Sequence, residues 1–392
     1  MFHRIPLLSL CFFAAWGLTA QVMLTGRVTD RDTEEPVAFA TVYLDGTSTG
    51  DVTADDGTFR IRVTTARRPL VVVISHLNYV NQTLSVDDPA APLAVALVAQ
   101  GNELTRIEVE DENQRAKNLR EFHRRLIGND IWGKNARILN EEVLFFERDR
   151  VAQDVKVHGA RMRPLLRRRN LPGASWSADS SELRYEKVLN LKATTRGALL
   201  VDLPDVGYRL RMDLKTFVND YASRQMAYLG TSFFTPYTEG TKREQKKLTK
   251  NRERAYWGSQ IHFGRALIAD SLAENGFSVV EIVKEARLGG QPETAPINLA
   301  KFLVREADGS YRLRGLDGRK FAILYFFGSR FRPAPVNRRR GTAPLQSRLL
   351  VAGEAIIYPD GTAGDTNLIF SGNIGGRGLA WWLPSDYQPP RE

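Results

Sequence analysis

Short apolar runs separated by turn residues fill residues 22–98, and this pattern constrains the fold more than any other feature of the chain. Runs of this length without a helical period are typical of strands in an all-β sandwich. In one run Phe59, Ile61 and Val63 alternate with arginines, as expected of a strand with one buried face. The pattern predicts a seven-stranded β-sandwich over residues 21–100, with strands at 23–29, 37–44, 50–53, 58–63, 70–75, 80–86 and 93–98.

The segment TADDGTFRI, residues 53–61, has two adjacent carboxylates before a glycine, which fits either a calcium loop or a tight turn. A helix-flanked calcium loop requires glycine at its sixth position and glutamate at its twelfth. Counted from Asp51, those positions hold Asp56 and Arg62. Asp-Gly is a strong turn pair instead, because both residues accept the left-handed conformation. The segment predicts a hairpin turn into a half-buried strand, with an irregular calcium site as the weaker alternative.

The same region resembles the carboxypeptidase regulatory-like domain in five short motifs: GRVTD at 26–30, EPV at 35–37, ATV at 40–42, DGT at 45–47 and TADDGTF at 53–59. A later segment, ISHLNY at 74–79, is similar to the family's strand that ends in a Gly-Tyr turn, with Asn78 in place of the usual glycine. The resemblance implies a prealbumin-like β-sandwich, widespread in exported proteins of Bacteroidetes. It implies a fold without an activity, because this domain accompanies certain zinc carboxypeptidases and is itself non-catalytic.

The histidines test whether the chain carries carboxypeptidase chemistry. An open zinc site of that kind needs a His-x-x-Glu pair and a further histidine. None of the five histidines has glutamate three positions later: His3, His76, His123, His158 and His262. Carboxypeptidase activity is therefore unsupported. For the chain as a whole we expect no metal site, no cofactor and no enzyme activity.

The first twenty residues have the order of a secretory signal peptide, with a basic residue, an apolar run and a small residue. The apolar run of about fourteen residues is shorter than the ~20 needed to span a bilayer. We expect cleavage between Ala20 and Gln21, with a membrane anchor or lipidation at Cys11 as the less favoured alternatives. Cleavage would remove Arg4 and the single cysteine, so the formal net charge of +10 would fall to +9 and no thiol would remain. The predicted location is the periplasm or the outer-membrane surface.

The pattern of residues 101–392 predicts a larger β-rich α+β domain with a few helices. Asp111 and Gln114 have the spacing of a helix N-terminal cap, and apolar residues then recur at helical spacing, which predicts a helix over 113–127. Apolar and charged residues alternate strictly over 208–215, as in an antiparallel strand with one face in water. Three Asp-Gly turns predict hairpins in the last third, at 307–310, 316–319 and 358–361.

This second region resembles the C-terminal portion of one group of exported proteins that carry the regulatory-like domain. The similar pieces include LREF at 119–122, VGY at 206–208, YLG at 228–230, AYWGS at 255–259 and LPSDY at 383–387. The resemblance implies an architecture and an exported location, and it implies no biochemical activity.

The strongest candidate for chemistry is the segment AYWGSQIHFGRAL, residues 255–267. On a helix, Ser259 and His262 would share one face, with Arg265 about one turn further along. A hydroxyl, an imidazole and an anion-holding guanidinium are the parts of a hydrolytic centre. The alternative is that apolar residues of the segment pack inward while the polar residues cap or brace the helix. We favour this structural interpretation, because no Gly-x-Ser-x-Gly elbow surrounds Ser259.

Three basic clusters supply the positive charge, at 161–169, 242–254 and 338–340. Arginine suits phosphate-rich polymers through its forked donors, so three arginines are candidate ligand-binding residues: Arg167, Arg168 and Arg169. A solvated face is the alternative for such charge runs. Trp381 and Trp382 are candidates for stacking on sugar rings, with core packing as the alternative.

These features predict an exported, non-catalytic envelope protein whose sandwich serves as a docking module for an unidentified partner. The alternatives are a binder of an anionic polymer or glycan, and a cryptic serine hydrolase centred on Ser259 and His262. The sequence specifies no oligomeric state, and no nucleic-acid partner is expected because no nucleic-acid fold signature is present. The expected partner is an envelope protein or an anionic envelope polymer, and the basic charge allows peripheral membrane association.

Overall fold

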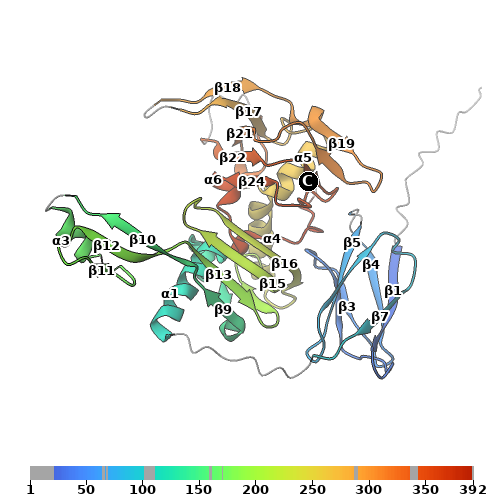
Figure 1. The fold of residues 1–392 in the computed structure, drawn as a ribbon. Helices are drawn as coiled ribbons and strands as arrows, with labels where there is room; N and C mark the ends of the chain where they lie inside the picture. Colours follow the sequence, from blue (N-terminus) through green and yellow to red (C-terminus); the bar gives the residue numbers. More distant parts are fainter. Residues whose placement is uncertain are drawn as a thin grey trace, which may run out of the picture.

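The structure is a computed structural model that describes residues 22–63, 67, 69–100, 111–158, 161–169, 171–286, 290–335 and 343–390. The N-terminal strands form a body of their own, blue in Figure 1, beside a larger body that runs from green to red. The expected cleavage site at Ala20 and Gln21 and the basic cluster at 338–340 lie outside the described residues. Within the described ranges, no helix combines the length and apolar character needed to cross a bilayer.

The N-terminal body is a β-sandwich of seven strands, as predicted. The strands are β1 Val22–Asp30, β2 Thr41–Leu44, β3 Gly50–Val52, β4 Thr58–Val63, β5 Leu70–Ser75, β6 Gln82–Val86 and β7 Leu93–Leu97. One sheet has the order β4-β1-β7 and the other β3-β2-β5-β6. In β4, Phe59 and Ile61 are buried while Arg60 and Arg62 are exposed, so the period of two places one face in the core.

The segment TADDGTFRI forms a tight turn, but it does not form the predicted hairpin. The Gly57 N–H donates to the Ala54 carbonyl at 2.8 Å, and the Ala54 N–H donates to the Thr58 carbonyl at 2.9 Å. Strand β3 before the turn pairs with β2, whereas β4 after it pairs with β1 in the other sheet. Gly57 has a φ of +75°, and a Cβ there would lie 2.3 Å from the Val28 carbonyl oxygen. Glycine is therefore required where the chain crosses between the sheets.

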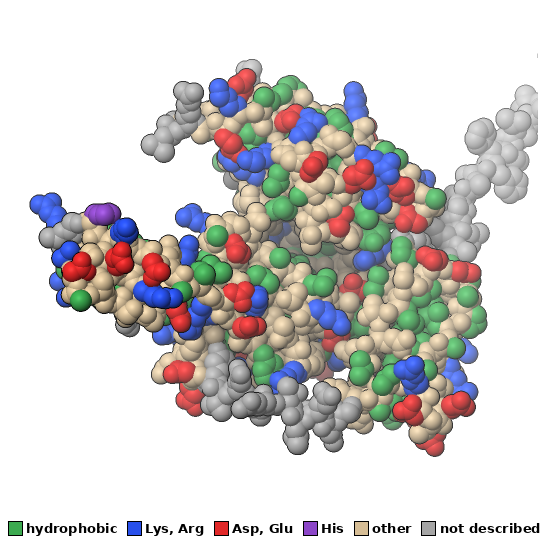
Figure 2. All heavy atoms as spheres, viewed as in Figure 1, with side chains coloured by type: hydrophobic (Ala, Val, Ile, Leu, Met, Phe, Trp, Pro, Cys, Tyr) green, Lys and Arg blue, Asp and Glu red, His purple; other side chains and the backbone are tan. Residues whose placement is uncertain are grey.

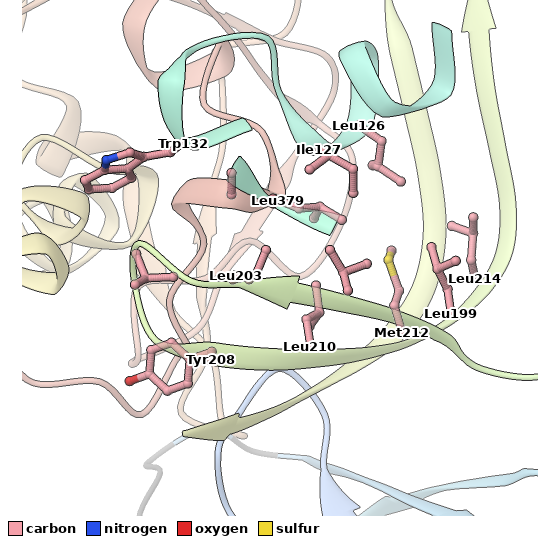
Figure 3. Close-up of a cluster of buried hydrophobic side chains, with 14 of the residues drawn as sticks. Leu126, Ile127, Trp132, Leu199, Leu203, Tyr208, Leu210, Met212, Leu214 and Leu379 are labelled. Atoms are coloured by element: carbon pink, nitrogen blue, oxygen red, sulfur yellow. The ribbon is translucent and has the colours of Figure 1, made fainter. Parts of the chain in front are cut away.

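The second region is built first around a six-stranded antiparallel sheet of order β8-β14-β15-β13-β9, with β16 paired to β15. Its strands are β8 Arg137–Ile138, β9 Leu144–Glu147, β13 Asn190–Thr195, β14 Leu199–Leu203, β15 Tyr208–Asp220 and β16 Met226–Pro236. Leu210, Met212 and Leu214 of β15 are buried, which confirms the predicted alternation. Figure 3 shows Leu210 and Met212 pointing from β15 toward the segments that carry Ile127 and Leu379.

Helical segments cover this buried face of the sheet. The Asp111 carboxylate accepts a hydrogen bond from the Gln114 N–H at 3.0 Å, which confirms the predicted cap. Phe122 packs edge-on against Phe217 of β15, with ring centroids 4.9 Å apart. The helical segments before β9 are α1 Glu112–Phe122, the π-helical turn η1 His123–Ile127, α2 Ile131–Asn135 and the 3-10 turn η2 Glu141–Val143.

The C-terminal part forms a further hydrophobic core around a five-stranded sheet, β18-β17-β21-β22-β24, and a three-stranded sheet, β19-β20-β23. Their strands are β17 Phe277–Lys284, β18 Glu293–Pro296, β19 Leu303–Arg305, β20 Tyr311–Leu313, β21 Lys320–Tyr325, β22 Leu345–Val351, β23 Ala355–Ile357 and β24 Leu368–Ser371. The helical elements that follow β16 in the chain are α4 Lys242–Tyr256, α5 Gln260–Ile268, η3 Leu299–Phe302, η4 Ser329–Phe331, α6 Gly372–Gly375 and η5 Leu379–Trp381. Trp257, between α4 and α5, packs against both cores and so joins the two parts.

The three predicted C-terminal hairpins have different outcomes. The turn at 307–310 joins β19 to β20, which pair antiparallel, so that prediction is confirmed. The turn at 316–319 joins β20 to β21, which belong to different sheets, so the hairpin prediction there is wrong. The turn at 358–361 closes on an antiparallel bridge between Ile357 and Ala363. Asp-Gly specifies a local reversal of the chain, whereas long-range pairing decides whether the flanking strands join.

A three-stranded arm, β10-β12-β11, projects from the central sheet (Figure 1). It consists of β10 Arg150–Lys156, β11 Ser175–Trp176 and β12 Glu182–Val188, with α3 Met162–Arg167 at its outer end. Within the described part of the chain, none of the arm's side chains belongs to the three hydrophobic cores.

Candidate functional site

The segment 255–267 is divided between two helices, and Ser259 stands at the break. Helix α4 ends at Tyr256 and α5 begins at Gln260. Ser259 is the N-cap of α5, and its Oγ accepts a hydrogen bond from the His262 N–H at 3.2 Å. The hydroxyl therefore satisfies one of the unpaired amides at the start of the helix.

His262 is a buried neutral side chain, with 2 % of its surface exposed. Its Nδ1 accepts from the Gly258 N–H at 3.1 Å, and its Nε2 lies 3.2 Å from the Asn275 Oδ1. Because Nδ1 accepts, Nε2 carries the proton and donates to the amide oxygen. Burial lowers the pKa of the imidazole to about 4. With the imidazole bound to Gly258 and Asn275 and the Ser259 hydroxyl bound to the helix backbone, this geometry lacks the nucleophile–base pair that the hydrolase hypothesis requires.

Arg265 braces the C-terminal segment against α5. Its Nε donates to the Asp360 carbonyl at 2.8 Å, its Nη2 to the Ser385 carbonyl at 2.7 Å and its Nη1 to the Tyr387 carbonyl at 3.0 Å. A guanidinium has five N–H donors, and three of them are directed at backbone carbonyls here. The side chain joins segments that are far apart in sequence, which is the bracing role favoured above.

Trp381 and Trp382 are half-buried and pack against the core of the central sheet. The Trp381 ring stacks on Trp132, with centroids 3.8 Å apart, and the Arg254 guanidinium lies 5.4 Å from its centroid. Trp382 packs against Tyr228 with centroids 5.5 Å apart. These contacts occupy ring surface that a stacked sugar would need, so the packing interpretation is favoured.

Arg167, Arg168 and Arg169 lie at the outer end of the arm and are exposed. Arg167 is placed 5.4 Å over the Trp176 ring and donates to the Ser180 hydroxyl at 3.2 Å. Trp381 and Trp382 instead pack against the core of the central sheet, to which no described side chain of the arm belongs. The structure thus does not bring the two predicted groups of ligand-binding residues together.

The polar face of β15 contacts the sandwich, a contact that the sequence pattern does not reveal. The Tyr43 hydroxyl donates to the Asp213 carboxylate at 2.8 Å, and the Asn81 amide donates to the same carboxylate at 2.9 Å. The Arg211 guanidinium donates to the Ser75 hydroxyl. The alternation of apolar and charged residues predicted that the charged side chains of β15 face water. Two of them, Arg211 and Asp213, instead form hydrogen bonds with the sandwich.

The β2–β3 turn of the sandwich lies against the C-terminal segment. The Asp386 carboxylate accepts from the Ser48 N–H at 3.1 Å and from the Thr49 hydroxyl at 2.8 Å. The Ser385 N–H donates to the Gly46 carbonyl at 2.7 Å. A docking surface of the sandwich is therefore used within the chain itself.

A cleft of about 640 Å³ lies between α4 and η4. Helix α4 begins with a capping box in which the Thr241 and Glu244 side chains bond each other's backbone N–H groups. The helix buries Leu248 and leaves Lys246 and Lys250 exposed one turn apart. The lining residues are Lys246, Thr249, Lys250, Glu253, Ser329, Arg330, Arg332 and Pro390.

The cleft is positively charged. Among the described residues that line it are four basic side chains and a single carboxylate. That carboxylate, Glu253, is buried and forms an ion pair with Arg332 at 3.5 Å. Lys246, Lys250 and Arg330 are exposed and give the cleft its charge. Arg330 has a φ of +55°, a left-handed backbone that is uncommon for arginine and that costs conformational energy.

Sequence reasoning found only part of this cleft. The basic cluster at 242–254 was identified, whereas Arg330 and Arg332 lie in a separate segment with no charge run among its described residues. Across the described ranges of the chain, no group of three or more His, Cys, Asp or Glu side chains could hold a metal ion. The exposed basic side chains of the cleft present positive charge to an anion.

Residues 24–109 match the family model of the CarboxypepD_reg-like domain. Two solved structures show weak likeness. A type II cohesin–X-dockerin complex from Acetivibrio cellulolyticus is 17% identical over 25% of this chain and 72% of that chain, with a TM-score of 0.18. A protein of unknown function from Bacteroides fragilis is 11% identical over 55% of this chain and 98% of that chain, with a TM-score of 0.17. No curated protein matches significantly. The N-terminal sandwich of this chain is a CarboxypepD_reg-like domain.

Proposed function

We propose that the chain is an exported, non-catalytic binding protein of the cell envelope, and that it holds an anionic polymer in the basic cleft between α4 and η4. The observation that carries the proposal is the charge of this cleft. Lys246, Lys250 and Arg330 line it together, and its carboxylate, Glu253, is already paired with Arg332. An anion entering the cleft would therefore meet unneutralised cations.

The size of the cleft supports a segment of a polymer as the ligand. Its volume of about 640 Å³ is open to solvent, so a polymer chain can extend beyond the residues that line it. Lys246 and Lys250 are compact charges on flexible stems, which suit phosphate or carboxylate groups along a chain more than a single rigid ligand. We propose a phosphate- or carboxylate-bearing envelope glycan.

The family of the sandwich and the contacts of Ser259 and His262 support a non-catalytic role. That family is regulatory-like, and here the domain docks on the second region through Asp213 and Asp386. The Ser259 and His262 side chains serve as a helix cap and a buried brace. The β2–β3 turn of the sandwich is occupied by this internal contact, and docking of the sandwich on an external partner stays a prediction.

The test compares two variants, each of which reverses the charge of two basic side chains at exposed helix positions. In the first, Lys246→Glu and Lys250→Glu reverse the charge of the cleft. In the matched control, Lys117→Glu and Arg120→Glu make the same change on the exposed face of α1. Glutamate is a good helix former, so both helices should be retained.

The measurement is the affinity for immobilised heparin, an anionic glycan probe, at low and at physiological salt. Since each exposed ion pair contributes ~0.2–1 kcal/mol, we expect the cleft variant to bind about tenfold more weakly and the control less than about threefold. The affinity of the unaltered protein should fall as salt screens the charges. Equal losses in both variants would show that net charge alone governs binding, and the proposal would then be wrong.

A further inference from the structure

The outer end of the arm carries a surface that the basic cleft does not include. We call residues 161–169, RMRPLLRRR, the tip segment. Strands β10 and β12 pair over seven residues, from Arg150 opposite Val188 to Lys156 opposite Glu182. Seven paired residues give the arm a length of about 20 Å, which carries the tip segment away from the central sheet.

The tip segment combines positive charge with exposed apolar side chains. It contains five arginines and no carboxylate. Met162 is 48% exposed and Leu165 is 55% exposed. Figure 2 shows basic side chains gathered at this end of the arm, with acidic side chains nearby along its strands.

Three of the four acidic side chains described in the arm, Asp154, Asp179 and Glu186, are engaged by other groups, and the fourth, Glu182, is exposed. Asp154 and Glu186 form ion pairs with arginines of the strands. Asp179, in the turn between β11 and β12, accepts hydrogen bonds from the hydroxyls of Ser177 and Ser181. Within the described part of the chain, no ion pair involves an arginine of the tip segment.

The tip segment is held on the arm by one of its own arginines. The Arg167 guanidinium lies 5.4 Å from the centroid of the Trp176 ring, and it donates to the Ser180 hydroxyl at 3.2 Å. Both partners belong to the β11–β12 side of the arm. Arg167 therefore contacts the β11–β12 side of the arm, and all three arginines, Arg167, Arg168 and Arg169, are exposed.

We infer that the tip segment docks the protein on an anionic lipid bilayer. The guanidinium groups bind lipid phosphates, and Met162 and Leu165 enter the boundary between headgroups and acyl chains. A soluble polyanion would satisfy the arginines but would offer no apolar surroundings to the two exposed side chains. Charge and apolar exposure on one short segment at the end of an arm together favour a bilayer, and this inference stands independently of the basic cleft.

The test is co-sedimentation of the mature protein with vesicles of phosphatidylglycerol and phosphatidylcholine, compared with vesicles of phosphatidylcholine alone. Two tip variants are used: Met162→Ser with Leu165→Ser, and Arg168→Glu with Arg169→Glu. The control, Leu229→Ser with Val283→Ser, removes apolar side chains that are 64% and 60% exposed elsewhere. Circular dichroism verifies that each variant is folded.

We expect both tip variants to lose at least about tenfold in affinity for the anionic vesicles, and the control to lose less than about threefold. The serine variant should retain its affinity for heparin, because its charges are unchanged. A serine variant that binds anionic vesicles like the unaltered protein would overturn the inference in favour of a soluble polyanion. Loss of vesicle binding in the Lys246→Glu and Lys250→Glu variant, with the tip variants unaffected, would overturn it in favour of the cleft.

Discussion

One carboxylate, that of Asp386, accepts several of the hydrogen bonds between the sandwich and the C-terminal segment. It accepts from the Ser48 N–H at 3.1 Å, the Ser48 hydroxyl at 3.1 Å and the Thr49 hydroxyl at 2.8 Å. Hydrogen bonds to charged groups contribute ~1.5–3 kcal/mol each, but contributions to one shared carboxylate are not additive. We therefore expect Asp386→Ala to lower the free energy of opening this contact by about 2 kcal/mol, or about 30-fold in the opening equilibrium.

Native-state amide hydrogen exchange measures this opening directly. The Ser48 N–H is bonded to Asp386, the Gly46 N–H to the Ser232 carbonyl and the Ser385 N–H to the Gly46 carbonyl. In Asp386→Ala these amides should exchange about 30-fold faster, whereas amides in the core of the sandwich should not change.

Two further variants make the exchange test selective. Asp386→Asn keeps one acceptor oxygen and should give an intermediate rate. Asp179→Ala removes a carboxylate that accepts from Ser177 and Ser181 within the arm, and it should leave exchange at 46–48 unchanged. Exchange in Asp386→Ala within about twofold of the unaltered protein would refute the reasoning, because the carboxylate would then contribute almost nothing.

Two other predictions concern the segment between α4 and α5. Burial lowers the pKa of His262 to about 4. Between pH 6.5 and 4 the unfolded chain therefore binds a proton that the folded chain does not, so the free energy of unfolding should decrease as the pH is lowered through this window. The loss should reach about 3 kcal/mol by urea unfolding and should be absent in His262→Gln, and equal pH slopes in the two proteins would contradict it. Ser259→Ala should cost about 1 kcal/mol of stability by loss of the N-cap, with heparin affinity unchanged. Weaker heparin binding at unchanged stability would instead indicate a functional role for this hydroxyl.

Features that depend on neighbouring residues could be predicted from the sequence. The strand at 58–63 has the predicted bounds because its alternation of buried and exposed side chains is a local pattern, and the strand at 70–75 has them because its run of β-branched apolar residues is one too. The cap formed by Asp111 on Gln114 was predicted for the same reason, since the two groups are three residues apart. The family resemblance of the sandwich also rested on short local motifs.

Predictions that depended on distant partners failed or were incomplete. The turns at 53–61 and 316–319 were expected to be hairpins, yet each joins strands of different sheets. The face of β15 assigned to water receives the sandwich through Asp213. In each case the local pattern fixes the backbone conformation, and only the packing of remote segments decides what lies opposite.

The candidate site shows the same division. The charge of α4 is visible as a run of basic residues at 242–254, and the exposed tip segment is visible as RMRPLLRRR. The cleft exists only because η4 brings Arg330 and Arg332 beside α4 and because Glu253 is paired there. The sequence by itself therefore determined the β-rich class, the sandwich and the positive charge, which follow from local periodicity and composition. The tertiary structure alone decided which cations share a cleft, which carboxylates join the two regions and which serine and histidine serve only in packing, because those outcomes depend on contacts between segments far apart in the chain.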